Sequence, residues 1–154
     1  MNLTKSITIA VITASTLMVA SPVMSHADHG ASVIKERKQG FKKMGKSMRA
    51  MGKQLKSGTN DMAVIEKSVN TIKVQSMKLE SWFKQETSTE SGYKTDALPA
   101  IWSNNPDFAK KAKALRDAAT DVQNSLGNSD FELKAAMMQL KKTCGSCHDK
   151  YKAD

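Results

Sequence analysis

The stretch LKAAMMQLKKTCGSCHDKY, residues 133–151, places its apolar and sulfur-bearing side chains at steps of three and four. Repeated steps of this size lie on one face of an α-helix. The stretch therefore predicts an amphipathic helix whose buried face also carries the only two cysteines of the chain. The residues on that face are Leu133, Met137, Leu140, Cys144, Cys147 and Tyr151.

Three earlier stretches repeat this spacing, at residues 34–55, 62–79 and 101–126. A sustained alternation of apolar and polar residues, which is typical of a β-strand, does not occur in the sequence. Four amphipathic helices with mostly short connections pack most simply with their apolar faces inward. The sequence therefore predicts an all-α protein, an antiparallel four-helix bundle.

The connections between these stretches carry helix-ending and helix-starting residues. Gly58 and Gly127 stand where two of the helices would end, and Asn60 or Asp61 would cap the second helix. Pro106 suits the first turn of a helix. The one long connection runs from about residue 84 to residue 99, which is too long for a tight turn.

Residues 1–27 are typical of a secretory signal peptide. Lys5 is their only charged residue, a long apolar run follows from Ile7 to Ala20, and Ser25-His26-Ala27 has small residues at the cleavage positions. A membrane anchor fits less well, because Ser and Thr interrupt the run and the cleavage site follows at once. We expect residues 28–154 to form a single domain in a bacterial periplasm, with no membrane anchor after cleavage.

The charge of the chain is strongly basic. The formal net charge is +9, and removal of the leader with its single Lys5 leaves +8. A basic protein favours acidic partners or an anionic cofactor. A nucleic-acid partner is not expected, because aromatic residues make up only 5% of the chain and the lysines are scattered along helix faces.

The segment Cys144-Gly145-Ser146-Cys147-His148 has the spacing C-x-x-C-H, the signature of covalent haem c attachment. Cys144 and Cys147 are three residues apart, so on a helix their side chains are neighbours at roughly 5–6 Å. This spacing suits two thiols that bond the adjacent vinyl groups of one porphyrin. His148 lies on the same face and is the expected axial ligand of the iron.

Three other interpretations fit these residues less well. A structural zinc site needs four ligands, and the only other histidine outside the leader is His29. A thioredoxin-like redox pair belongs to a βαβ unit, whereas this sequence predicts no strands. A plain disulfide between Cys144 and Cys147 would leave His148 without a role.

Three segments give the chain a resemblance to the class II c-type cytochromes, and to cytochrome c′ in particular. They are ERKQGFKKMGKSM at residues 36–48, PAIWSNNPDFAKKAKAL at residues 99–115 and TCGSCHDKYK at residues 143–152. The resemblance extends over essentially the whole chain after the leader. It implies a four-helix bundle with one haem c attached to its last helix.

The resemblance places Phe41 on the side of the iron opposite His148. Phenylalanine has no donor atom, so the iron would be five-coordinate beneath an apolar ring. Met44 and Met48 lie on the same helical face one and two turns further on. If either thioether bound the iron, the protein would instead be a six-coordinate, low-spin electron carrier. Plain core packing is the ordinary explanation of such methionines.

Two basic positions also follow from the resemblance. Arg37 begins the haem-facing stripe, and its guanidinium would pair with a haem propionate, although a surface residue at a helix start is the alternative. Lys38 replaces a glutamine of the family. Lys152 stands where the family often has arginine beside the histidine. A cation there would stabilise an anion or adjust the pocket on that side, and a solvated lysine at a helix end is an equally good interpretation.

The expected function is therefore that of a haem protein that binds small gases and not of a proven enzyme. By resemblance the ligands are NO and CO, and the role is scavenging or storage of NO with redox cycling of the iron. The family also implies a homodimer that pairs through the first two helices, and periplasmic redox partners are possible. A haem-free helical interaction protein is the remaining alternative.

Overall fold

The computed structural model describes residues 26–153, and within this range the chain forms helices and turns but no strand. Of the expected leader, residues 1–25 lie outside the described residues. Among the helices of the described range, none has the length and apolar character that a membrane crossing requires.

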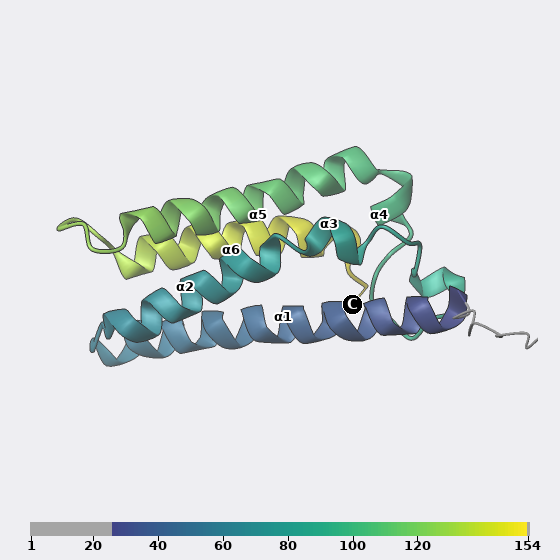
Figure 1. Ribbon diagram of the computed structural model, residues 1–154. Helices are drawn as coiled ribbons and strands as arrows, with labels where there is room; N and C mark the ends of the chain where they lie inside the picture. The colour runs from purple at the N-terminus through teal and green to yellow at the C-terminus, as the bar shows by residue number, and fades with distance from the viewer. Residues whose placement is uncertain (1–25, 154) are drawn as a thin grey trace, which may run out of the picture.

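Four long helices make up the fold. They are α1 (His26–Ser57), α2 (Met62–Ser76), α5 (Asn105–Ser125) and α6 (Leu133–Tyr151). Each runs antiparallel to the next, and α6 packs back against α1 (Figure 1). The architecture confirms the predicted all-α, antiparallel four-helix bundle, and α6 has the bounds that its periodicity predicted.

The residues expected to end and start helices do so. Gly58 follows α1 at a φ of 68°, and Gly127 follows α5 at 87°, both in the left-handed region that glycine adopts without strain. Asp61 caps α2, because its Oδ1 accepts hydrogen bonds from the backbone N–H groups of Ala63 at 3.0 Å and Val64 at 3.3 Å.

Two of the predicted helices are each divided in two. The second pattern continues past α2 into a separate turn, α3 (Leu79–Trp82), and the third begins with a separate turn, α4 (Ala100–Ser103). The break before α5 falls at Asn104, whose φ of −128° and ψ of 48° are not helical. The bend before α3 brings Leu79 and Trp82 into the core. A short 3₁₀ turn, η1 (Thr89–Ser91), lies in the long connection.

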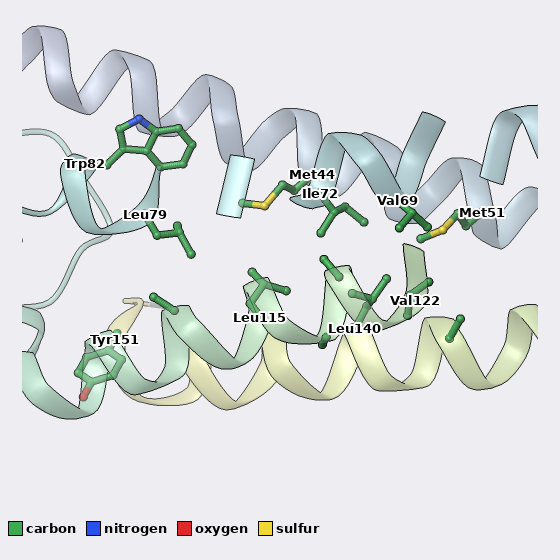
Figure 2. Packing of buried hydrophobic residues seen from close by; sticks show 14 of the residues in the cluster. Met44, Met51, Val69, Ile72, Leu79, Trp82, Leu115, Val122, Leu140 and Tyr151 are labelled. Atoms are coloured by element: carbon green, nitrogen blue, oxygen red, sulfur yellow. The ribbon is translucent and has the colours of Figure 1, made fainter. Parts of the chain in front are cut away.

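The core fills the space between the two pairs of helices. Figure 2 shows side chains from α1 and α2 pointing toward those from α5 and α6. Full burial of one such aliphatic side chain contributes about 1.5–3 kcal/mol. The buried side chains labelled along this seam are Met44, Met51, Val69, Ile72, Leu115, Val122 and Leu140.

The long connection closes one end of the bundle and holds the end of α6. Leu98 N–H donates to the carbonyl of Tyr151 at 3.1 Å, and Ala153 N–H donates to the carbonyl of Asp96 at 2.8 Å. Ala97 and Lys152 thereby form an isolated antiparallel bridge. The last turn of α6 is therefore fixed to residues 96–98.

Candidate functional site

A cavity of about 510 Å³ lies at this end of the bundle, between α1, α3, α5, α6 and the long connection. Its volume is in the range of 300–1,000 Å³ that is usual for sites of small ligands and cofactors. Its walls are mainly apolar. The apolar side chains that line it are Phe41, Met44, Met48, Leu79, Phe83, Ala97, Ile101, Phe108, Ala112, Leu115 and Tyr151.

The α6 wall of this cavity carries the C-x-x-C-H segment. Cys144, Cys147 and His148 all line the cavity. The two cysteines are half-buried free thiols, and His148 is exposed. No cluster of three or more His, Cys, Asp or Glu side chains suited to a metal ion occurs among the described residues. The three groups that the spacing singled out are thus brought to one surface.

Burial controls the protonation of both thiols. It raises the pKa of Cys144, and it raises the pKa of Cys147 to about 11, with the positive charge of Lys111 opposing the rise. Both sulfurs therefore remain thiols at neutral pH in the folded chain. Neither has the depressed pKa that is typical of a redox-active cysteine pair.

The α1 wall presents Phe41, Met44 and Met48 to the same cavity. Phe41 is 37% exposed, and its ring meets Trp82 edge-on with the centroids 5.8 Å apart. Met44 is buried in the core and Met48 is half-buried. The structure therefore places the expected ring and both alternative thioethers on one wall.

Arg37 also lines the cavity, but its described hydrogen bonds go to the long connection. Its Nη1 donates to Thr87 Oγ1 at 2.7 Å, and its Nη2 donates to the Thr87 carbonyl at 3.0 Å and to Thr95 Oγ1 at 2.5 Å. The guanidinium lies over the ring of Phe83, 4.7 Å from its centroid. The side chain is only 2% exposed, and burial lowers its pKa while the charge of Asp96 opposes that effect.

Three lysines also line the cavity. Lys38 Nζ donates to the carbonyl of Lys94 at 2.8 Å, and Lys152 Nζ donates to the carbonyl of Ala153 at 2.7 Å. Lys111 of α5 is the third, and no pattern in the sequence distinguishes it from the other lysines of the helix faces.

Tyr151 links the cavity wall to a surface carboxylate. Its hydroxyl donates to Asp107 Oδ2 at 2.6 Å, and Lys150 Nζ donates to the same oxygen at 2.9 Å. These two hydrogen bonds, that from Tyr151 first, lower the pKa of Asp107. Burial and then the bond to Asp107 raise the pKa of Tyr151. The pair ties the end of α6 to the start of α5.

The lowered pKa of Asp107 predicts a specific acid sensitivity. A carboxyl group with a depressed folded-state pKa adds stability above its unfolded pKa of about 3.9, and this stability is lost as the pH falls through the folded value. Asp107→Asn should therefore flatten the decline in unfolding free energy as the pH falls below about 4. Urea titrations across this range measure the slope. Asp121→Asn, an exposed control on the same helix, should keep the wild-type slope, and equal slopes for all three proteins would contradict the assignment.

These features fit a porphyrin held through sulfur. Two neighbouring thiols and a histidine stand on one wall of a largely apolar cavity. In haem c, two cysteines bond the porphyrin and a histidine ligates its iron. A helical bundle that carries this segment on its last helix belongs to the class II type of c-type cytochrome.

The comparisons with known proteins agree with this class. The family described as Cytochrome C′ matches residues 32–152, and the chain belongs to it. Members of the family carry covalently bound haem c, typically one per chain, and the protein is accordingly a c-type haem protein of the electron-transport kind. Cytochrome c′ of Rhodopseudomonas palustris is 34% identical over 122 residues, which are 79% of this chain and 82% of that protein.

Solved structures resemble the fold closely. A cytochrome c′ described by an unusual ligand-controlled dimer dissociation superposes with a TM-score of 0.73 at 25% identity, and covers 81% of this chain and 97% of its own. A ferrous variant of cytochrome c′ from Alcaligenes xylosoxidans with bound NO gives a TM-score of 0.68 at 26% identity, over 81% and 96% of the two chains.

Proposed function

We propose that the cavity between α1, α5 and α6 is the haem site, that Cys144 and Cys147 form the two thioether bonds, and that His148 is the axial ligand. The support is the arrangement of all three side chains on one wall of a cavity of suitable size and polarity. When bound there, haem supplies an iron that changes oxidation state and takes small neutral diatomic ligands.

We further propose that the iron is five-coordinate and that the protein binds NO or CO. The observation that carries this proposal is Phe41, which stands on the α1 wall with a ring that has no donor atom. Phe83, which contacts Phe41 and also lines the cavity, likewise has a ring without a donor atom. The NO held by the A. xylosoxidans relative supports the choice of ligand. Scavenging or storage of NO is the role that we assign.

A second candidate is a six-coordinate electron carrier. Met44 and Met48 line the same wall as Phe41, one and two turns along α1. A thioether is an established iron ligand in cytochromes c. Met44 is only 7% exposed and packs in the core with residues of the other helices. This packing favours the core role, and with it the five-coordinate proposal.

Two cations are assigned supporting roles. We propose that Arg37, whose guanidinium lies at the cavity wall, pairs with a haem carboxylate while the threonines of the long connection hold it in place. Lys152 lies at the same cavity beyond His148 and adds positive charge on that side.

Location and assembly complete the proposal. Residues 1–27 act as a cleaved leader, and the domain of residues 28–154 works in the periplasm, where it exchanges electrons with redox partners.

The protein is a homodimer that pairs through α1 and α2. Exposed apolar side chains on and after α2, Val74 at 42% and Met77 at 57%, support a contact there, and a related cytochrome c′ forms dimers that dissociate under ligand control.

The absorption spectrum of the reduced protein, with and without CO, tests the proposal. Five-coordinate iron should give a high-spin spectrum that changes fully on addition of CO. A low-spin spectrum that resists CO would instead establish the methionine-ligated alternative. A pyridine haemochrome assay on the same sample measures covalent haem, and a colourless protein would reject both candidates in favour of a haem-free helical protein.

A further inference from the structure

Gly40 lies in the middle of α1 at a buried position. Glycine inside a helix costs about 1 kcal/mol relative to alanine, so its presence needs a reason. A β-carbon at this position would lie 2.6 Å from Cζ2 and 2.8 Å from Cζ3 of Trp82, and closer still to Cη2. The indole of Trp82 thus rests directly on the backbone of α1, where only glycine leaves room for it.

Trp82 is in turn a neighbour of Phe41. The indole is only 2% exposed and stands edge-on to the Phe41 ring, at an interplanar angle of 61°. Phe83 gives Phe41 a second ring contact, with centroids 6.3 Å apart. Because Phe41 is 37% exposed, these two rings form much of the packing that keeps its side chain in place.

We propose that Trp82, seated on Gly40, is a positioning residue that fixes the ring of Phe41 over the cavity and thereby sets how fast a diatomic ligand enters. The proposal rests on the assignment of Phe41 as the ring that closes a five-coordinate site. A ligand must pass Phe41, so the entry rate follows the fraction of time for which the ring is displaced. A ring that loses its edge contact is displaced more often.

The kinetic test is a double-mutant cycle on the haem-loaded protein. Phe41→Ala should raise the CO association rate roughly tenfold or more, and Trp82→Leu should raise it about fivefold, the factor that corresponds to one aromatic edge contact. If Trp82 acts through Phe41, the two effects do not multiply: Phe41→Ala/Trp82→Leu should be as fast as Phe41→Ala alone. Flash photolysis of the CO complex gives these rates.

A control separates positioning from general loosening of the bundle. Val69 is fully buried on α2 but does not line the cavity, so Val69→Ala should lower stability and leave the CO rate unchanged. If Trp82→Leu does not yield folded protein, Trp82→Phe replaces it and should give a smaller acceleration, because a ring remains.

A second readout does not involve ligand binding. Gly40→Ala should lower the folding equilibrium constant roughly tenfold to a hundredfold, because the methyl group overlaps the indole. Trp82→Leu should remove most of this penalty when the two changes are combined. Gly52→Ala is the matched control on the same helix, because a β-carbon there would lie at an ordinary 3.5 Å from Met137 Cε; it should not destabilise the protein. Guanidinium titrations of the wild type and of the four variants, Gly40→Ala, Trp82→Leu, their combination and Gly52→Ala, measure these changes.

The outcomes separate the inference from the proposed function. An unchanged CO rate in Phe41→Ala would reject Phe41 as the closing ring and the inference with it. A fast Phe41→Ala beside an unchanged Trp82→Leu rejects only the role of Trp82. The role of Trp82 is also rejected if the effects of Phe41→Ala and Trp82→Leu on the CO rate multiply in the double variant. It is likewise rejected if Gly40→Ala destabilises the protein as much in the Trp82→Leu background as in the wild type.

Discussion

Replacing both Cys144 and Cys147 with alanine is expected to give a polypeptide with no covalently bound haem. Each thiol at the cavity wall supplies one sulfur for a thioether bond, and no other cysteine occurs in the sequence to replace them. The measurement is haem staining of the denatured protein after electrophoresis, together with its intact mass. We expect the haem signal to be lost completely, the largest effect of any substitution considered.

A matched control lies between the two cysteines. Ser146 is exposed, and its hydroxyl donates to the carbonyl of Thr143 in its own helix, at 3.0 Å. Ser146→Ala should therefore keep normal attachment. The double cysteine variant should also unfold at lower temperature, because the apolar cavity walls come from α1, α5 and α6, and a group bonded among them holds these helices together. Haem that survives denaturation in the double variant would disprove the assignment of the two sulfurs.

The periodicity of the sequence was enough to predict the long helices but not the breaks in two of them. Helix α6 runs from Leu133 to Tyr151 as predicted, because its apolar spacing is regular and glycine and polar residues precede it. The chain bends before Leu79 without a glycine or proline to mark the place. The turn that follows the bend packs Trp82 against Gly40 of α1, and the periodicity of a single chain carries no information about such a contact between distant segments.

At the site, too, the sequence predicts which residues share one helix face but not which distant segments meet. Residues on one helical face share a wall, so spacing alone brought Cys144, Cys147 and His148 together, and the family resemblance added Phe41 and Arg37. The threonines that bind Arg37 come from residues 84–99, which have no periodic pattern, and their partner lies 50 or more residues away in sequence. Hydrogen bonds between segments so far apart in the chain are therefore visible only in the structure.

Replacing Arg37 with methionine is expected to lower the unfolding free energy by about 3 kcal/mol. A hydrogen bond from a charged donor contributes about 1.5–3 kcal/mol, and a buried acceptor left without a donor adds a further penalty. The change would leave Thr87 and Thr95 without their guanidinium donors. The loss is moderated because the buried charge is itself costly, as its lowered pKa indicates. Guanidinium denaturation of the haem-loaded protein measures the change.

Two further variants decide how Arg37 acts. Arg49 is an exposed arginine of the same helix, and Arg49→Met should change stability by no more than about 0.5 kcal/mol. Arg37→Lys should not restore stability, since one ammonium group cannot reproduce a planar fork that reaches both Thr87 and Thr95. In Arg37→Met, hydrogen exchange should accelerate in residues 84–99 and in the last turn of α6, because the backbone bonds of residues 96–98 join the two segments. If Arg37→Met matched Arg49→Met in stability and exchange, the guanidinium would not be holding this end of the bundle closed.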